Sequence, residues 1–386
     1  MRIAGSYQFP TMESVIYGKP AAEALREEAK RLDAKRIYLI VSRTLNTKTD
    51  EIEKIRKALG NRYAETFDGV PQHTTREVVV RIAEQAKELK ADLVVAIGGG
   101  SVVDAAKIVL MCMEHEIFDQ DGLDGFETTA ERRFAQFRTP KVRMTAIPST
   151  LSGGEYNSGA LVTDTRRKLK QIFNHPMMMP RSIILDPAIT KFTPEELWLG
   201  SGTRAMDHGI EAICSSRPNA LVDAVCQQGL RYLHDGLRRT KNDPNDEEAR
   251  LNCQLGSWMS AFGLQARVPM GASHAIGHVL GGTCDVPHYF CTAVMMPSVL
   301  RYNRPATEAA QRTIATALGA PDHDASEAFA GLIGELGLPR RLAEVGVAED
   351  RFELIGKNAM LSIFTRANPQ PIRGPGDVVK ILKLAA

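Results

Sequence analysis

Apolar and polar residues alternate in two different ways along the 386-residue chain. In the first half, short β-branched runs end in polar or glycine-rich turns, which is typical of strands that are buried on both faces. Helical repeats separate these runs, for example over 76–90, where apolar residues recur every three or four positions. This alternation predicts a parallel sheet covered by helices on both sides. The expected strands are 36–41, 93–97, 144–148 and 182–186.

The pattern changes after residue 186. Thr193, followed by Pro194 and two glutamates, predicts the N-cap and first turn of a helix. From there to the C-terminus apolar residues repeat with helical spacing, and no segment has the pattern of a strand. The sequence therefore predicts an α/β domain over 1–186 and an all-α domain over 187–386. Helix breaks are expected at 217–219, 242–245 and 281–282.

Composition narrows the class of protein. The apolar share of 44% and the charged share of 24% are ordinary for a globular chain, and the length suits two cores. Lysine plus arginine (48) nearly balances aspartate plus glutamate (46), which argues against a nucleic-acid or membrane partner. There is no signal-peptide core, and six cysteines without C-x-x-C spacing predict buried thiols. We expect a cytoplasmic protein.

Three glycines follow the predicted strand 93–97. Gly98, Gly99 and Gly100 let the backbone turn sharply and approach a ligand closely. Ser101 is expected to cap the next helix, whose free amide groups and positive end would form a phosphate or pyrophosphate site. A tight strand–helix turn without a ligand is the alternative.

Two charged residues on the same helix favour the ligand. Asp104 and Lys107 are three positions apart and project from one helix face. The lysine can reach a ribose or phosphate oxygen from there. An ion pair between the two residues is the other interpretation.

Histidines gather in the predicted helical domain. Arg204 and His208 lie one helical turn apart, as do His274 and His278, and His288 follows. Imidazoles at this spacing can share a metal ion or a substrate, and neutral imidazole suits zinc, iron or nickel. A single histidine would more often be a buried structural residue, whereas several at regular spacing favour a functional site.

Together these motifs resemble the iron-containing (group III) alcohol dehydrogenase family over nearly the whole chain. The resemblance implies an N-terminal dinucleotide-binding domain, a helical catalytic domain, an architecture like that of dehydroquinate synthase, a cofactor between the domains and a homodimer. The segments that carry it are 68–71, 98–107, 148–155, 273–281, 286–288 and 296–303.

The resemblance also implies a nicotinamide cofactor. An aspartate after the first strand of the family can repel the 2′-phosphate of NADP, but here that region reads Val41-Ser42-Arg43-Thr44. We therefore expect NADPH or dual use, with an exposed Arg43 that touches nothing as the alternative. The expected cofactor contacts are Ser42, Arg43, Gly98, Gly99, Gly100, Ser101, Asp104, Ser149, Thr150, Ser152 and Lys170.

The family holds its metal ion with one aspartate and three histidines. His208, His274 and His288 occupy the histidine positions, but Arg204 stands where the aspartate belongs. A guanidinium repels a divalent cation, and Asp207 is expected to point about a quarter-turn away. We therefore expect no metal ion; if one is present, those three histidines would bind it.

The maleylacetate reductase branch of the family also lacks the full ligand set and is regarded as metal-independent. Segments 278–283 and 287–288 resemble that branch. Arg204 and the histidines would then polarise the substrate carbonyl, or Arg204 would clamp a substrate carboxylate. The alternative for Arg204 is a structural ion pair to Glu211, Asp207 or Glu155.

These features predict NAD(P)H-dependent reduction of a small oxo acid or aldehyde. His278 is the expected proton donor, with His208 or His288 as alternates. Two rival functions remain open: a metal-dependent alcohol or aldehyde dehydrogenase that uses the three histidines alone, and a lyase related to dehydroquinate synthase with bound NAD.

Overall fold

The chain forms two compact units in a computed structural model that describes residues 7, 9–129 and 137–386. One unit spans 10–193 and the other comprises 194–386 with Tyr7 and Phe9. The division falls a few residues after the predicted boundary at 186. Helix α6 (Pro187–Thr190) contributes Ile189 to the core of the first unit, and the Thr193 hydroxyl donates to the Ser149 carbonyl at 2.7 Å.

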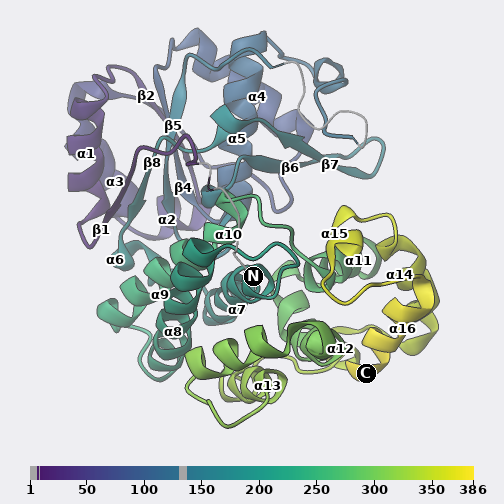
Figure 1. The fold of residues 1–386 in the computed structure, drawn as a ribbon. Coiled ribbons are helices and arrows are strands. Elements are labelled where there is room, and N and C mark those ends of the chain that lie inside the picture. Colours follow the sequence, from purple (N-terminus) through teal and green to yellow (C-terminus); the bar gives the residue numbers. More distant parts are fainter. Residues whose placement is uncertain (1–6, 8, 130–136) are drawn as a thin grey trace. The chain divides into compact units, whose positions relative to one another are not determined.

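The first unit is built on a parallel sheet (Figure 1). The four predicted strands are confirmed as its four inner strands, which are almost completely buried. The two edge strands are partly exposed, so they lack the continuous apolar runs that made the others recognisable. Among the described residues the order is β1 (Ser14–Tyr17), β8 (Ser182–Leu185), β5 (Arg143–Pro148), β4 (Leu93–Gly98), β2 (Ile37–Val41) and β3 (Tyr63–Phe67).

Helices cover both faces of this sheet, as strand β2 illustrates. Ile37, Leu39 and Val41 share a core cluster with residues of α1 (Ala21–Arg31) and α3 (Glu51–Leu59). Tyr38 lies on the opposite face, where its hydroxyl donates to Gln85 at 2.9 Å. That face carries α4 (Arg76–Glu88) and α5 (Gly100–His115), while α2 (Arg43–Lys48) follows β2 directly.

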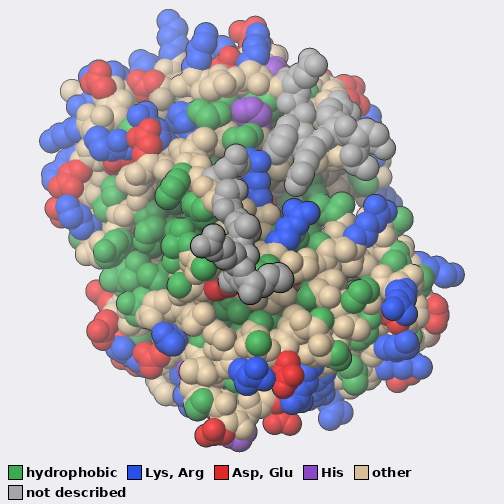
Figure 2. Space-filling view, viewed as in Figure 1, with side chains coloured by type: hydrophobic (Ala, Val, Ile, Leu, Met, Phe, Trp, Pro, Cys, Tyr) green, Lys and Arg blue, Asp and Glu red, His purple; other side chains and the backbone are tan. Residues whose placement is uncertain are grey.

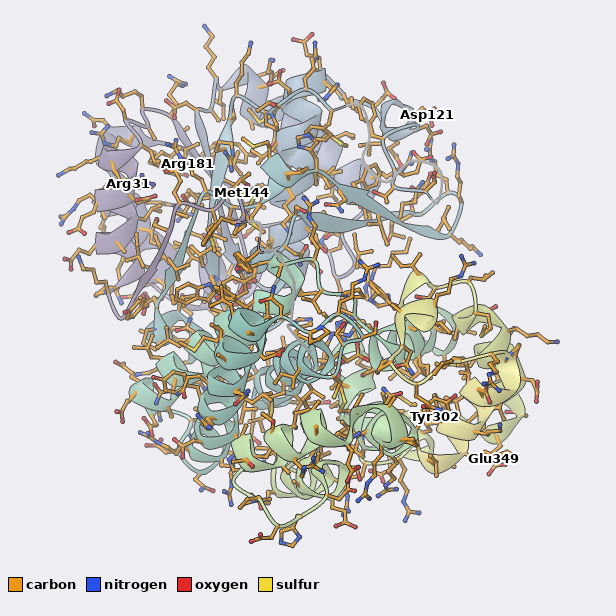
Figure 3. The ribbon with its side chains drawn as sticks, viewed as in Figure 1. Arg31, Asp121, Met144, Arg181, Tyr302 and Glu349 are labelled. Carbon is orange, nitrogen blue, oxygen red and sulfur yellow. The ribbon has the colours of Figure 1, made fainter. Side chains whose placement is uncertain are left out.

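An antiparallel hairpin, absent from the sequence prediction, joins this unit: β6 (Gly159–Asp164) and β7 (Leu169–Asn174). Arg76 anchors it from α4: its side chain is fully buried and its Nε donates to Gln171 at 2.9 Å. The turn between the strands is exposed and carries Arg166, Arg167 and Lys168. Its Arg166 pairs at 2.8 Å with Asp121, which is labelled in Figure 3.

The described residues of the second unit form helices joined by turns and loops and include no strand, as predicted. Helix α7 is its centre: every residue from Trp198 to Ile213 is buried, and α8, α9 and α12 pack against it. The helices are α7 (Glu195–Ile213), α8 (Ala220–Asn242), α9 (Glu247–Ser260), α10 (Phe262–Gln265), α11 (Ala272–Cys284), α12 (His288–Ala317), α13 (Ala325–Glu335), α14 (Phe352–Ala359), α15 (Ile363–Ala367) and α16 (Pro375–Leu384).

Two of the predicted helix signals are wrong. Thr193 does not cap α7, because Pro194 occupies the cap position and the Thr193 hydroxyl is used elsewhere. The glycines at 281–282 do not end a helix: α11 continues through them to Cys284, and the following cap residue Asp285 has left-handed backbone with φ 55°. The breaks at 217–219 and 242–245 are confirmed, since α8 runs between them.

The surface and the thiols agree with the composition. Basic and acidic side chains share the face shown in Figure 2, as a net charge of +2 implies. All six cysteines are free thiols and only Cys284 is partly exposed. Within the described residues, no helix has the length and apolar character needed to cross a bilayer.

Candidate functional site

The glycine turn lies at the carboxyl ends of three neighbouring strands. β4 ends in Gly98; the Ser42 N–H, after β2, donates to the Ile97 carbonyl at 2.7 Å. The Ser149 N–H, after β5, donates to the Gly98 carbonyl at 3.0 Å. The structure therefore brings together predicted cofactor contacts from three separate segments, at the edge of a parallel sheet where ligands commonly bind.

The turn leaves little room for side chains. A Cβ on Gly98 would lie 2.9 Å from the Val102 side chain, and one on Gly99 would lie 3.2 Å from the Thr150 side chain. Gly100 is as close to Ser152, at 3.2 Å. Gly99 and Gly100 therefore pack closely against the loop after β5, and Gly98, with φ 158°, packs against the first turn of α5, whether or not a ligand is bound.

Ser101 does not cap α5, contrary to the prediction. The helix begins at Gly100, Gly99 occupies the cap position, and no described side chain caps this end. The first-turn amide groups and the positive end of the helix are therefore suited to an anionic ligand such as a pyrophosphate. This fits a dinucleotide better than a capping serine would have.

Lys107 has neither of the two roles considered for it. It is fully buried, and its Nζ donates to the carbonyls of Gly154 and Gly159, both at 2.6 Å. Lys107 therefore binds the loop after β5 from the interior of the unit and is not available to a ligand. Asn157 adds a longer contact at 3.4 Å.

Three ionisable groups near this loop have shifted pKa values. Removal from water raises the pKa of Asp104 to about 6, although Lys107 and Lys170 oppose this. Burial also raises the pKa of Glu155 to about 7 and lowers the pKa of Lys107 to about 8. Lys170, on β7, is thus close enough to Asp104 to interact with it. Desolvation is the largest cause in all three cases.

Arg43 opens α2 directly after Ser42 and its side chain is exposed. No described residue forms an ion pair with it. Both interpretations of Arg43, as a partner of a 2′-phosphate and as an exposed arginine, are therefore still open.

In the helical unit, four ionisable residues form a stripe along α7: Arg204, Asp207, His208 and Glu211. Their spacing of three and four residues places them on one face of the helix. All four are buried, which is unusual for such residues unless they are paired.

Asp207 connects three helices. Its Oδ2 accepts hydrogen bonds from Arg204 Nη1 at 2.7 Å, from the Ser273 hydroxyl of α11 at 2.8 Å and from the Thr292 hydroxyl of α12 at 2.7 Å. The expectation that Asp207 points away from the site is wrong, because its side chain turns toward α11 and α12. Arg204 therefore forms a buried ion pair with Asp207, one of the alternatives considered for it.

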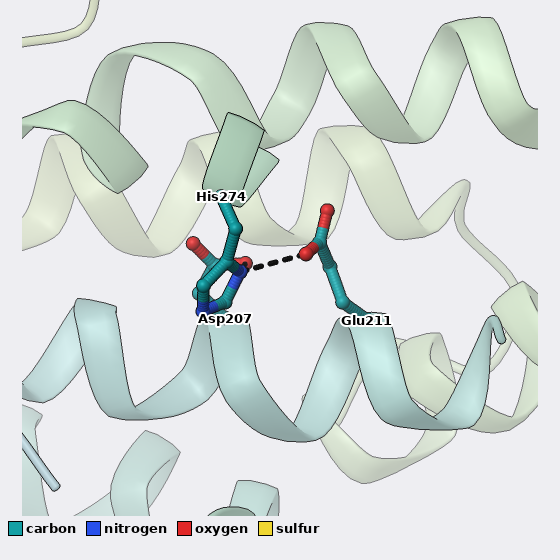
Figure 4. A group of neighbouring side chains, drawn as sticks. All are labelled: Asp207, Glu211 and His274. Atoms are coloured by element: carbon teal, nitrogen blue, oxygen red, sulfur yellow. Dashed lines mark hydrogen bonds and ion pairs between the residues drawn. The ribbon is translucent and has the colours of Figure 1, made fainter. Parts of the chain in front are cut away.

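Glu211 binds the helix that carries His274 (Figure 4). Its Oε2 lies 2.7 Å from His274 Nδ1 and accepts the Gly271 N–H at 2.7 Å, while Oε1 accepts the Ser273 N–H at 2.8 Å. Asp207 Oδ1 is 3.4 Å from the same Nδ1. His274 is thus held by two carboxylates from the adjacent turns of α7.

The imidazole rings of the other three histidines lie next to His274 or next to one another. His208 lies 5.2 Å from His274 between ring centroids, and His278 lies 6.4 Å from His274. His278 is exposed and stacks with His288 at 5.5 Å. The structure therefore brings all four predicted histidines into one cluster, with Phe364 5.9 Å from His274.

Charges in the cluster shift its pKa values in opposite directions. Burial raises the pKa of Asp207, but His274 and Arg204 outweigh it and leave that pKa well below the usual range. Burial and Arg204 both lower the pKa of His208. Burial and Arg204 also lower the pKa of His274, but the negative charges of Asp207 and Glu211 raise it more. The pKa of His274 therefore lies above its ordinary value.

The cluster does not fit a metal site of one carboxylate and three imidazoles. Of the described residues, the only group of three or more His, Cys, Asp or Glu side chains with ligand atoms all within 4.8 Å of one another is Asp207, Glu211 and His274. Their carboxylates already accept several hydrogen bonds, and Arg204 adds a positive charge. His208 and His288 do not complete such a group with His274. Two buried ring nitrogens, His208 Nδ1 and His274 Nε2, nevertheless have no hydrogen-bond partner among the described residues.

Comparison with known proteins agrees with this division of the chain. Residues 12–187 match the model of iron-containing alcohol dehydrogenases, and residues 199–386 match the C-terminal model of the same family. The chain belongs to the iron-containing alcohol dehydrogenase family. It is therefore an oxidoreductase that acts on CH–OH or C=O groups.

Individual relatives confirm the predicted resemblance to the maleylacetate reductase branch. Maleylacetate reductase 1 of Cupriavidus pinatubonensis is 29% identical over 93% of this chain and 91% of its own length. The 4-hydroxybutyrate dehydrogenase of Cupriavidus necator is 28% identical over 91% and 92%. The crystal structure of maleylacetate reductase from Agrobacterium tumefaciens has the same fold, with a TM-score of 0.84 and 24% identity over 100% and 98% of the two chains. These relatives favour an oxidoreductase over the lyase alternative.

Sequence reasoning missed several members of the cluster. Thr292 lies outside every segment that carries the resemblance, and Ser273 begins one of them but was given no role, because hydroxyl groups are common in helices. Glu211 was considered only as an ion-pair partner of Arg204. A usable signal was present, since Arg204, Asp207, His208 and Glu211 repeat at helical spacing within a segment of small and apolar residues.

Proposed function

We propose that this chain is an NAD(P)H-dependent reductase of a small oxo acid and that it works without a metal ion. The observation that carries the proposal is Arg204: a buried guanidinium stands at the position where the family has its anionic metal ligand. It donates one hydrogen bond to Asp207, and within the described residues no acceptor meets its other N–H groups. An arginine has several such donors in a planar fork that matches a carboxylate.

In this proposal the cofactor and the residues of the two sites have separate roles. The bound cofactor supplies a hydride to the carbonyl carbon. Arg204 holds the substrate carboxylate, and Asp207 keeps the guanidinium oriented. A histidine of the cluster gives a proton to the carbonyl oxygen, and we retain His278 as the candidate because it is exposed. The amide groups at the start of α5 would hold the pyrophosphate.

The test is an assay at 340 nm with NADH and NADPH against a panel of oxo acids and uncharged aldehydes. We expect oxo acids to be reduced with the higher kcat/KM, and we expect full activity after dialysis against a chelator. Stoichiometric metal in the purified protein that is lost together with activity would overturn the metal-free part. Faster reduction of uncharged aldehydes would overturn the assignment of Arg204 as a carboxylate clamp.

A second candidate is a metal-dependent dehydrogenase, and one observation favours it. His208 Nδ1 and His274 Nε2 are buried without hydrogen-bond partners in the described part of the chain, and a cation would satisfy both. Elemental analysis of protein purified after growth with added zinc or iron separates the two candidates, because only the second requires bound metal.

A further inference from the structure

Glu211 is a buried carboxylate to which the proposed reaction assigns no task. It belongs to α7, yet its hydrogen bonds all go to α11 and the residue before it: the N–H groups of Gly271 and Ser273 and the Nδ1 of His274. Gly271 is the N-cap residue of α11, and no described side chain of its own segment caps this helix. Glu211 therefore binds the positive end of the helix whose histidine it also holds.

This arrangement determines which ring nitrogen of His274 carries a proton. An ionised carboxylate can only accept hydrogen bonds. Glu211 Oε2 lies 2.7 Å from Nδ1, and the nearest oxygen of Asp207 lies 3.4 Å from the same atom. With carboxylates on that side of the ring, Nδ1 must be protonated, and Nε2 is the only ring nitrogen left for another partner.

The surroundings of Nε2 indicate that its partner comes from outside the described residues. This atom is buried and has no hydrogen-bond partner among the described residues. A buried polar atom without a partner costs free energy, so it commonly marks a place where a ligand or water binds. The ring cannot turn to satisfy it, because turning would break the bond to Glu211, and that carboxylate is itself fixed by two backbone N–H groups.

We propose that Glu211 is a positioning residue that keeps a proton on Nδ1 of His274 and thereby directs Nε2 to the substrate. The inference rests on the proposed function for the identity of the substrate, but the state of the ring does not depend on it. A carboxylate behind a histidine sets its tautomer and its orientation, and loss of such a partner commonly costs about 10–100-fold in activity. The competing explanation is that Glu211 serves only as a helix cap.

The first test uses the wild-type protein. Histidine labelled with ¹⁵N at both ring positions gives separate signals for protonated and bare nitrogens, and the His274 signals are assigned by their absence in His274→Gln. We expect a protonated Nδ1 throughout the range in which the protein is folded. A bare Nδ1 with the proton on Nε2 would overturn the proposal, whatever the enzyme reduces.

The second test compares Glu211→Met with a control that loses a similar cap. Asp324 caps α13 by accepting the Ser326 N–H at 2.8 Å and, among the described residues, pairs only with Arg304, so Asp324→Ala removes a capping carboxylate that has no recorded contact with a histidine of the cluster. Both variants should lower the unfolding temperature. Only Glu211→Met should lower kcat at least about tenfold, with the Kd for NADPH within about twofold of wild type.

The outcomes separate the two proposals. If Glu211→Met lowers kcat no more than Asp324→Ala does, Glu211 is a cap and the positioning role is wrong. If the variant does not fold, the wild-type spectrum still decides. If the spectrum shows the protonated Nδ1 but oxo acids are poor substrates, the proposed function fails while the assignment of the His274 proton stands.

Discussion

The glycine turn and the histidine cluster are both candidate ligand sites, but they are built from different material. The turn presents backbone amide groups, and its glycines are packed so closely that side chains contribute little. The cluster presents side chains from three helices, and buried charges dominate it. Substitutions at the turn should therefore act through steric clashes and backbone strain. Changes in the cluster should act through unpaired charges and hydrogen bonds, which are costly when buried.

The largest effect is expected from Arg204→Ala. The substitution removes the proposed carboxylate clamp and deprives the buried Asp207 of its cationic partner. We expect kcat/KM for an oxo acid to fall by an amount that corresponds to a loss of about 2–5 kcal/mol in transition-state stabilisation. This range is typical of truncating one member of a buried charge pair. Steady-state kinetics with an oxo acid and with an uncharged aldehyde of similar size measures the difference.

Arg204→Lys is the matched control for this change. Lysine keeps the positive charge next to Asp207 but lacks the planar fork, so it should recover stability more fully than activity. Equal losses for the oxo acid and the aldehyde in Arg204→Ala would mean that Arg204 is only a structural partner of Asp207. The cluster would then have no demonstrated preference for acids.

At the glycine turn, Gly99→Val should weaken cofactor binding by about 100-fold, or about 2.7 kcal/mol. A Cβ at Gly99 would lie 3.2 Å from Thr150, and the branched side chain would also occupy the surface where the pyrophosphate has to approach. Fluorescence titration with NADPH measures the Kd. Gly282→Val is the control, because nothing lies within 4 Å of a Cβ at that position. Unchanged affinity in Gly99→Val would remove the turn from the cofactor site.

The two sites also differ in how far the sequence could predict them. The turn was recognisable because its glycines are consecutive and follow a buried strand, and the segments it gathers end neighbouring strands of the sheet. The lysine in the motif was misread, since nothing local shows that Lys107 is directed inward to Gly154 and Gly159. The tight turn was predictable from the pattern of glycines after an apolar run, but the buried partners of Lys107 were not.

In the cluster, the histidines were predictable and their partners were not. Helical spacing shows which residues share a face, but it does not show how a side chain bends. Asp207 was expected to point away and instead reaches Ser273, 66 positions later in the chain. The bond from Glu211 to His274 spans 63 positions, so it depends on the packing of α7 against α11. Such contacts follow from tertiary structure and leave no local signature.

An intermediate effect is expected on stability, from Glu155. Its pKa is raised to about 7 in the folded protein by burial, compared with a value of 4.5 for an exposed glutamate. Between these values the folded state binds more protons than the unfolded state, so stability should fall as pH rises from about 4.5 to 7. The loss attributable to this group should be about 1–3 kcal/mol. Urea unfolding at about pH 5 and pH 8 measures it.

Glu155→Gln removes the titrating group and should flatten this part of the pH dependence. Glu84→Gln serves as the control, because Glu84 is exposed on α4 and should leave the pH dependence as in wild type. Asp104 and Lys107 titrate in all three proteins, but both interact electrostatically with Glu155, so the difference between Glu155→Gln and wild type includes the change in that coupling. If Glu155→Gln follows the wild-type curve, the carboxyl group is not protonated in the folded protein near pH 6, and the desolvation argument fails for this loop.

The smallest effect is expected from Arg43→Ala, which tests whether a side chain contributes to the backbone-built site at all. Arg43 begins α2 next to Ser42, whose N–H donates to the Ile97 carbonyl beside the glycine turn, and this is the position from which we propose that it pairs with an adenosine 2′-phosphate. Because its side chain is exposed, an ion pair with that phosphate should be worth only about 0.5–1 kcal/mol. We therefore expect the NADPH/NADH ratio of kcat/KM to fall by about 2–5-fold, almost entirely through NADPH, and to approach the wild-type ratio again in Arg43→Lys. Lys48→Ala, at the far end of the same helix, should leave the ratio unchanged. A ratio that is the same in Arg43→Ala and in wild type would show that Arg43 touches nothing and that the glycine turn selects its cofactor by backbone alone.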